Sequence, residues 1–251
     1  MAASRKCIAV SPSGIPEGDL ARSGEEKSMN LFDMIGPVMV GPSSSHTAGA
    51  VRIGNVCRRL LGETVARADI YLHGSFLATG KGHGTDRALV AGLLGFAVDD
   101  ERIPDSFAWA AKSGMEFSFA GIDLGSDAHP NSVKLCLAGK SGRKLDVTAS
   151  SIGGGQICIN SIDGITTNFS GDCPTLIVHN LDQPGHVAEV TSMLEHKMVN
   201  IASMQLYRNG RGRDAVMVLE CDQEVPRDGI RWLEHLEGVE KVTYLGMTDE
   251  E

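Results

Sequence analysis

The sequence has few cysteines, few aromatic residues and no long apolar run. Its six cysteines lie far apart, with no Cys-x-x-Cys pair and no Cys/His spacing typical of a metal site. They are Cys7, Cys57, Cys136, Cys158, Cys173 and Cys221. We therefore expect reduced thiols and no metal ligands in this chain. No apolar stretch approaches the ~20 residues of a membrane span, and no secretory signal opens the chain. These absences predict a cytoplasmic protein with no membrane association.

Positive charge is also scarce. The chain carries 23 Lys and Arg against 32 Asp and Glu, for a net charge of -9. Its basic clusters, at Arg58-Arg59 and between Arg208 and Arg213, are too short to neutralise a polyanion. The composition therefore predicts no nucleic-acid partner. The length of 251 residues allows one large or two ordinary domains, each with its own core.

Residues 1 to 28 are rich in Ser, Gly, Pro and charge, without apolar periodicity, and we predict a disordered leader there. Beyond it the pattern predicts a mixed α/β first domain over residues 29 to 171. We expect helices at 48–61, 85–94 and 104–111, a strand at 68–72, a Gly-rich loop at 74–84, and strands at 116–120, 133–137, 145–149, 157–159 and 165–169.

The segment Gly171-Asp172-Cys173-Pro174 predicts a boundary, followed by a second domain over residues 172 to 251. We expect strands at 175–179, 201–207, 214–220 and 239–245, helices at 185–196 and 226–236, and a turn at Asn209-Gly210. The order βαββαβ is that of a ferredoxin-like fold. The predicted fold class is therefore α+β, with a mixed α/β domain before a ferredoxin-like one.

The main candidate site is the segment Gly41-Pro42-Ser43-Ser44-Ser45-His46-Thr47, which precedes the first predicted helix. Hydroxyls and amides at a helix N-terminus can bind a carboxylate, and a neutral His there can accept a proton near neutral pH. Ser43, Ser44, Ser45 and Thr47 would donate hydrogen bonds to the carboxylate. The alternatives are that a serine only caps the helix, and that His46 donates to the substrate or is a loop residue.

Other candidates lie in two glycine-rich segments. Gly74-Ser75 ends the predicted strand, and Lys81 and His83 follow within Gly80-Lys81-Gly82-His83-Gly84-Thr85-Asp86. This segment lacks the spacing of a nucleotide-binding P-loop. Lys81 and His83 could offer positive charge to a carboxylate or to a partner, or lie in a solvated loop. Gly153, Gly154 and Gly155 predict a tight bend that also lets another group approach closely.

Three segments in this order resemble the iron-sulfur-dependent L-serine dehydratases, and in particular their beta subunit. They are the run from Phe32 to Gly49, the run from Gly74 to Asp86, and Ser151-Ile152-Gly153-Gly154-Gly155-Gln156-Ile157. The resemblance covers roughly residues 30 to 169, and Met29 is expected to lie near the natural start. It implies a first domain similar to the allosteric substrate-binding domain of phosphoglycerate dehydrogenase.

The second domain is similar to an ACT domain, a small module that binds amino acids, usually between paired copies. This resemblance implies regulatory residues at the turn Asp182-Gln183-Pro184-Gly185, and at Asn180, Asn200 and Ile201. It also implies an oligomer that forms through this domain.

The family resemblance implies conversion of L-serine to pyruvate and ammonia with a 4Fe-4S cluster and without pyridoxal phosphate. An open iron of the cluster acts on the serine hydroxyl, while a base, here His46, takes the α-proton. Cluster ligands are cysteines at recognisable spacings, so we expect them on a separate alpha subunit. The alternative is a non-catalytic amino-acid-binding protein that regulates another enzyme.

Overall fold

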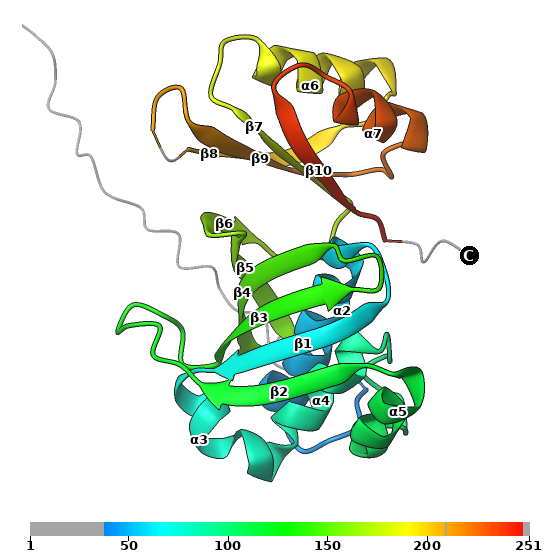
Figure 1. Ribbon diagram of the computed structural model, residues 1–251, viewed down its shortest axis with the longest axis vertical. Helices are drawn as coiled ribbons and strands as arrows, with labels where there is room; N and C mark the ends of the chain where they lie inside the picture. Colours follow the sequence, from blue (N-terminus) through cyan, green and yellow to red (C-terminus); the bar gives the residue numbers. More distant parts are fainter. Residues whose placement is uncertain (1–37, 209, 248–251) are drawn as a thin grey trace, which may run out of the picture.

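The computed structural model describes residues 38–208 and 210–247, so the predicted leader 1–28 and Asn209 lie outside the described residues. The chain forms two modules, each built on one sheet, and the smaller sheet lies above the larger one in Figure 1. No helix in these ranges is long and apolar enough to cross a membrane.

The N-terminal module has a six-stranded sheet in the order β2-β1-β3-β4-β5-β6, with β1 parallel to β2 and the other pairs antiparallel. Figure 1 shows α2 and α4 together on one face of this sheet. The elements are η1 (Ser44–Ala48), α2 (Gly49–Leu61), β1 (Val65–Leu72), α3 (Gly74–His83), α4 (Thr85–Leu93), η2 (Ile103–Asp105), α5 (Ser106–Ser113), β2 (Glu116–Gly121), β3 (Ser132–Gly139), β4 (Lys144–Gly153), β5 (Gln156–Ile162) and β6 (Ile165–Phe169).

The C-terminal module has a four-stranded antiparallel sheet in the order β10-β7-β9-β8. Its elements are β7 (Thr175–Leu181), α6 (His186–His196), β8 (Ile201–Arg208), β9 (Asp214–Cys221), α7 (Arg227–Glu234) and β10 (Val239–Leu245). Both helices lie on the side of the sheet that faces away from the N-terminal module (Figure 1). The βαββαβ order and the strand arrangement confirm the predicted ferredoxin-like fold.

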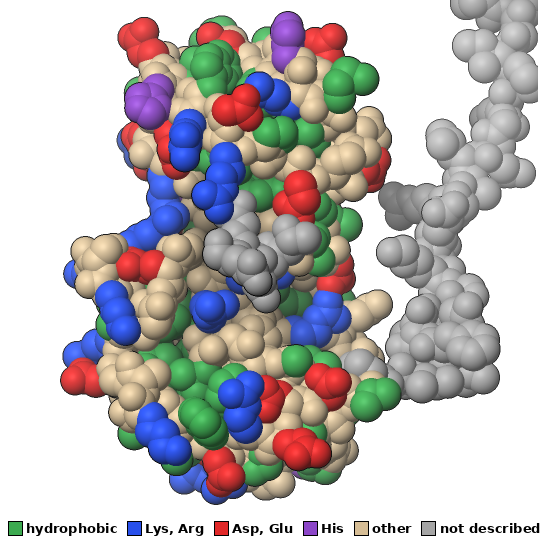
Figure 2. Space-filling view, turned by 90° about the vertical axis from the view of Figure 1, so that its right-hand side faces the viewer, with side chains coloured by type: hydrophobic (Ala, Val, Ile, Leu, Met, Phe, Trp, Pro, Cys, Tyr) green, Lys and Arg blue, Asp and Glu red, His purple; other side chains and the backbone are tan. Residues whose placement is uncertain are grey.

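The apolar core of the N-terminal module extends into the C-terminal module, which also has a second buried cluster of its own. Ile177, Val216, Val218 and Leu245, on the face of the smaller sheet without helices, belong to the same buried cluster as the core of the N-terminal module. Lys241 also pairs with Asp163 at 2.6 Å. Figure 2 shows Lys and Arg side chains gathered on one face near the junction of the modules. The C-terminal module is therefore packed onto the N-terminal one, because burial of this apolar face stabilises the contact.

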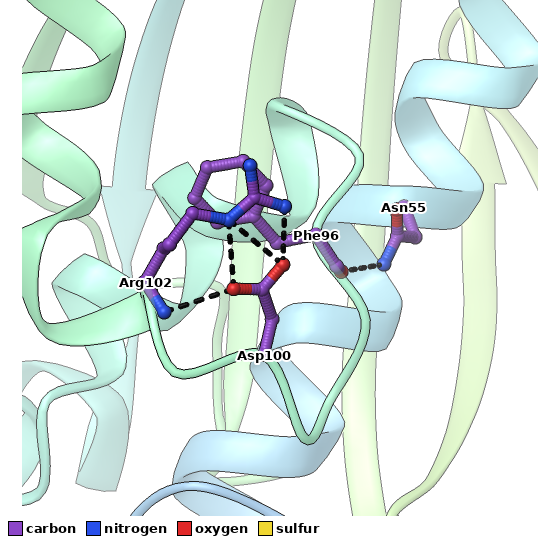
Figure 3. A network of polar contacts seen from close by, with 4 residues as sticks. All are labelled: Asn55, Phe96, Asp100 and Arg102. Carbon is purple, nitrogen blue, oxygen red and sulfur yellow. Dashed lines mark hydrogen bonds and ion pairs between the residues drawn. The ribbon is translucent and has the colours of Figure 1, made fainter.

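The loop between α4 and η2 is held by a polar network (Figure 3). The guanidinium of Arg102 lies 4.2 Å from the centre of the Phe96 ring, and its Nη2 lies 2.6 Å from the Asp100 carboxylate. Hydrogen bonds from Arg102 also hold the pKa of the Asp100 carboxyl below its usual range. The backbone oxygen of Phe96 accepts a 2.7 Å hydrogen bond from Asn55 on α2. The network thus joins the exit of α4 to the neighbouring helix.

Two local predictions were wrong. Residues 74–83 form helix α3, where the glycines predicted a loop, because packing outweighs their poor helix propensity. The Cβ of any other residue at Gly74 would lie 2.5 Å from the Pro130 oxygen, and that oxygen also accepts a hydrogen bond from Ser75 N. The first helix also begins earlier than predicted, since Ser44–Ala48 forms a π-helical turn that continues into α2.

Helices α2 and α4 cross in backbone contact at two glycines. A Cβ at Gly54 would lie 2.5 Å from the Leu89 oxygen, and one at Gly92 would lie 2.1 Å from the Val51 oxygen. Backbone atoms on a packed helix cannot move aside without shifting the helix. The crossing therefore requires glycine at both positions.

We predict that Gly54→Ala lowers the free energy of unfolding by about 1–3 kcal/mol, because the methyl group overpacks the helix crossing. Gly82→Ala is the matched control. It adds the same methyl group to helix α3, where nothing lies within 4 Å, and should raise stability by up to ~1 kcal/mol through helix propensity. Denaturant unfolding followed by circular dichroism measures both. Equal effects of the two substitutions would contradict the close crossing.

Candidate active site

The centre of the site is His46, which lies in the π-helical turn at the start of α2. Such turns occur often at functional sites. The turn is fixed by Ser43, whose hydroxyl accepts a 3.1 Å hydrogen bond from His46 N and whose carbonyl accepts one from Thr47 N at 2.9 Å. Ser43 therefore caps the helix, as one of the alternatives stated. The hydroxyls of Ser44 and Ser45 take no part in this cap.

Hydroxyl groups surround the buried imidazole of His46. Its Nε2 lies 3.1 Å from Ser75 Oγ and 3.1 Å from Thr79 Oγ1, both on α3. Its Nδ1 lies 3.4 Å from Ser45 Oγ, which is 3.4 Å from Ser43 Oγ. The residue as a whole is 9% exposed. The structure thus brings the predicted residues Ser43, Ser45, His46 and Ser75 together.

Two further rings complete the surroundings of His46. The ring of Phe76, which is fully buried, packs edge-on at 5.4 Å between centroids, and the ring of His83 does so at 4.9 Å. Burial lowers the pKa of His46, and the charge of His83 lowers it further, while a backbone hydrogen bond of Ser75 partly opposes them. At neutral pH His46 is therefore a neutral ring that can accept a proton.

Lys81, His83 and Thr47 line an adjacent cavity of about 480 Å³. Arg87 and Asp86 of α4 lie in the same wall. Thr47 is buried and donates a 3.1 Å hydrogen bond to the His83 oxygen, so its hydroxyl hydrogen already has an acceptor within the protein. The predicted role of Thr47 as a donor to substrate stays a prediction. Its observed contact joins the start of α2 to the end of α3.

The three predicted glycines Gly153, Gly154 and Gly155 form the tight turn between β4 and β5, all with positive φ. The Gly155 oxygen accepts a 3.0 Å hydrogen bond from Arg52 of α2, and Arg52 also pairs with Asp172 in the segment between the modules. The turn is thereby connected to α2, the helix that follows the turn carrying His46. Its predicted contact with substrate stays a prediction.

Sequence reasoning missed two contributors. Thr79 was not selected because residues 74–84 were expected to be a loop; in a helix, Thr79 comes one turn after Ser75 and faces the same way. The turn His129-Pro130-Asn131 was not among the candidate residues either. Pro130 nevertheless accepts the hydrogen bond from Ser75 N, and Asn131 accepts one from Ser151 N. This turn therefore supports both glycine-rich segments.

The predicted regulatory residues fall into two groups. Asn180, Asp182, Gln183, Pro184 and Gly185 lie at the end of β7 and before α6. Asn180 pairs with Ala215, whereas Ile201 pairs with Cys221 at the other end of β9. The structure therefore places Asn200 and Ile201 at the opposite end of the sheet from the other five.

Buried polar atoms lie near the first group. Among the described residues, Asn180 Oδ1 and His186 Nε2 have no hydrogen-bond partner, although the two residues are only 3% and 6% exposed. Asp182, by contrast, accepts hydrogen bonds from Arg208 at 3.3 Å and from Gly212 N at 3.2 Å. Asp182 thus fixes the turn to the β8–β9 hairpin. The other two residues carry unused hydrogen-bonding capacity.

The fold and this site together define a two-module α+β protein with a neutral histidine lined by hydroxyl groups. A model of the family described as serine dehydratase beta chain matches residues 30–161. The chain belongs to this serine dehydratase beta chain family.

Two relatives that cover most of the chain agree with this assignment. The L-serine dehydratase beta chain of Peptoniphilus asaccharolyticus is 42% identical over 194 residues, covering 77% of this chain and 87% of that one. A probable L-serine dehydratase beta chain of Bacillus subtilis is 39% identical over 217 residues, covering 86% and 98%. A D-3-phosphoglycerate dehydrogenase of Methanocaldococcus jannaschii is 24% identical over 198 residues, 79% of this chain and 37% of that one, which agrees with the predicted fold.

We predict that His46 titrates with a pKa below 6.5 in the full chain, and that His83→Gln raises this pKa. The substitution removes a neighbouring positive charge that disfavours protonation of His46, while burial continues to lower its pKa. Proton NMR of the imidazole C2–H resonances across pH measures both values. His196→Gln, on the exposed surface of α6, is the control and should leave the titration unchanged. A His46 pKa above 6.5, or one unmoved by His83→Gln, would contradict this electrostatic account.

Proposed function

We propose that this chain supplies the substrate-binding wall and the proton acceptor of an L-serine dehydratase, which converts L-serine to pyruvate and ammonia. The observation that carries the proposal is the buried His46 ring, whose pKa is lowered by burial and by His83, beside a group of hydroxyls. A neutral imidazole near the working pH is a suitable general base for an α-proton. The family membership of the chain supports the same reaction.

Each residue of the site has a role in this proposal. Ser43, Ser44 and Ser45 donate hydrogen bonds to the substrate carboxylate at the helix N-terminus, where the helix dipole favours negative charge. His46 accepts the α-proton and the β-hydroxyl leaves as hydroxide, which takes up a proton to form water, so that the elimination releases one water in all; the resulting enamine hydrolyses to pyruvate and ammonia. Lys81 and His83 add positive charge near the carboxylate or toward a partner. Since the chemistry needs no Schiff base, no lysine is assigned that role and no pyridoxal phosphate is proposed.

We propose that the 4Fe-4S cluster of the enzyme is held by a separate alpha subunit, because the cysteines of this chain do not fit it. Within residues 38–208 and 210–247, no group of three or more His, Cys, Asp or Glu residues could hold a metal ion. Burial raises the pKa of Cys57 far above its usual range and that of Cys221 to about 11, so these thiols resist the deprotonation that iron ligation requires. A heterodimer in the cytoplasm follows as part of the proposal.

We predict that His46→Ala lowers kcat by about 10²- to 10⁴-fold in the complex with the alpha subunit, because general base catalysis contributes that much. The measurement is a pyruvate assay after anaerobic co-expression and iron reconstitution, with iron content determined alongside. His196→Ala, exposed on α6, is the control and should keep full activity. A variant with normal kcat and a raised KM would instead assign His46 to substrate binding and place the base elsewhere.

We also propose that the C-terminal module is an ACT domain that binds a regulatory amino acid at the turn Asp182–Gly185. The unused polar atoms of Asn180 and His186 and the open space beside Gly185 support this proposal. Asn200 and Ile201 lie too far along the sheet to join this group in one chain. If the β8 edge strands of two chains paired in antiparallel fashion, Asn200 and Ile201 of one chain would lie at the same end of the joined sheet as the turn Asp182–Gly185 of the other. Met204 and Leu206 on β8 are 40% and 46% exposed, so apolar surface is available there for such pairing.

We predict that Gly185→Leu shifts the half-saturation for L-serine in the complex and leaves the maximal rate in place. The side chain would occupy the open space at the start of α6, and site-to-site coupling is typically ~1–3 kcal/mol, or roughly 5- to 150-fold. Gly142→Leu is the matched control, since Gly142 also has positive φ and open space, but lies in the β3–β4 turn. If calorimetry of the full chain detects no amino acid at this module, and both variants keep the same saturation curve, the regulatory proposal fails.

A further inference from the structure

The hydrogen atoms around His46 can be assigned from the contacts of Thr79. The hydroxyl of Thr79 donates to the backbone oxygen of Ser75 at 2.9 Å, one helical turn earlier. A threonine hydroxyl has one hydrogen, so Thr79 Oγ1 then offers only lone pairs to other neighbours. One of these neighbours is His46 Nε2 at 3.1 Å.

This arrangement distinguishes the two neutral forms of the His46 ring. With hydrogen on Nε2, the ring donates to Thr79 Oγ1 or to Ser75 Oγ, and Ser75 Oγ can donate to Thr79 Oγ1 at 3.4 Å. With hydrogen on Nδ1, Nε2 can accept a hydrogen bond from Ser75 Oγ, but it would also face the lone pairs of Thr79 Oγ1 at 3.1 Å. Relief of that contact would require Thr79 to give up its bond to Ser75. The first form is favoured, since in it Nε2 meets the acceptor oxygen of Thr79 with a hydrogen rather than with a lone pair.

The opposite side of the ring has a different neighbour. Nδ1 faces Ser45 Oγ at 3.4 Å, and Ser45 Oγ faces Ser43 Oγ at 3.4 Å. Both serines belong to the segment proposed to bind the substrate carboxylate. The titratable group beside the ring is His83, at 4.9 Å between ring centroids. A substrate bound along the serines would therefore approach the Nδ1 edge, whereas Nε2 is occupied by the two hydroxyls of α3.

We propose that Thr79 is a positioning residue that holds the hydrogen of neutral His46 on Nε2, so that Nδ1 is the nitrogen that accepts the proton. The assignment to Nε2 depends on this chain alone. The use of Nδ1 as base rests on the proposed function. With Nδ1 as the base, the α-carbon of the amino-acid substrate would lie beside Ser45, on the side of the ring that faces the serines.

The test of the tautomer uses the full chain without its partner, labelled with ¹⁵N. Long-range ¹H–¹⁵N NMR at a pH above the His46 titration reports which ring nitrogen carries hydrogen, and a His46→Gln sample identifies the signals. We expect the Nε2–H form in the wild type and in Thr79→Ser, which keeps the hydroxyl. Thr79→Val, which removes it, should increase the Nδ1–H fraction severalfold. An Nδ1–H wild type, or a Thr79→Val spectrum identical to wild type, overturns the proposal.

Thr191→Val is the matched control for loss of a helix-bound hydroxyl. Thr191 lies on the exposed side of α6 and donates to the Val187 oxygen at 2.8 Å, as Thr79 does to Ser75. This variant should leave the His46 signals unchanged. Thermal unfolding of all variants identifies any general loss of structure, and Thr79→Ala, which also removes the hydroxyl, replaces Thr79→Val if that variant does not fold.

The catalytic arm uses the complex with the alpha subunit. We expect Thr79→Val to lower kcat roughly 3- to 10-fold with little change in KM, as loss of one hydrogen bond implies, and Thr79→Ser to restore it. If the tautomer result fails while His46→Ala still abolishes turnover, Thr79 has no positioning role and the proposed function stands. If the tautomer result holds while His46→Ala is fully active, the Nε2 assignment stands and His46 is not the base.

Discussion

The site depends on the backbone contact between α2 and α4 at Gly54 and Gly92. Both helices begin beside the site: α2 continues the turn that carries His46, and α4 starts two residues after His83. The crossing of the helices therefore sets the separation of the two histidines, whose rings lie 4.9 Å apart. The chemistry is positioned by packed helices rather than by a loop, which limits how far the imidazole can move.

Burial and the neighbouring charge lower the pKa of His46 in the free chain, and a bound substrate would raise it. In the free chain, desolvation and His83 favour the neutral ring. A carboxylate placed beside Ser45 would favour the protonated ring, because an opposite charge at close range stabilises it. The imidazole would thus be unprotonated before the substrate binds and a stronger base afterwards.

Much of the architecture could be predicted from the sequence because its elements have clear periods and clear ends. The βαββαβ order of the C-terminal module is an example, with apolar strands, amphipathic helices and turns marked by glycine. Helix α3 could not be predicted in this way, since Gly74, Gly80 and Gly82 oppose a helix and only the contacts with Pro130 and Thr85 explain it. Thr79 was missed for the same reason. Asn200 and Asp182 lie at opposite ends of the sheet because of the way β7 and β8 pair with β9, and sequence motifs alone do not give this pairing.

The apolar face that the smaller sheet presents to the N-terminal module has a consequence for how such chains can be rearranged. Ile177, Val216, Val218 and Leu245 would become exposed to water if the chain were divided between Phe169 and Thr175, as would the surface they cover. Each module therefore needs the surface of the other to keep this apolar face buried, unlike domains that are joined only by a flexible linker. Recombination that moved the C-terminal module to another protein would succeed only where the new host offered a complementary apolar surface.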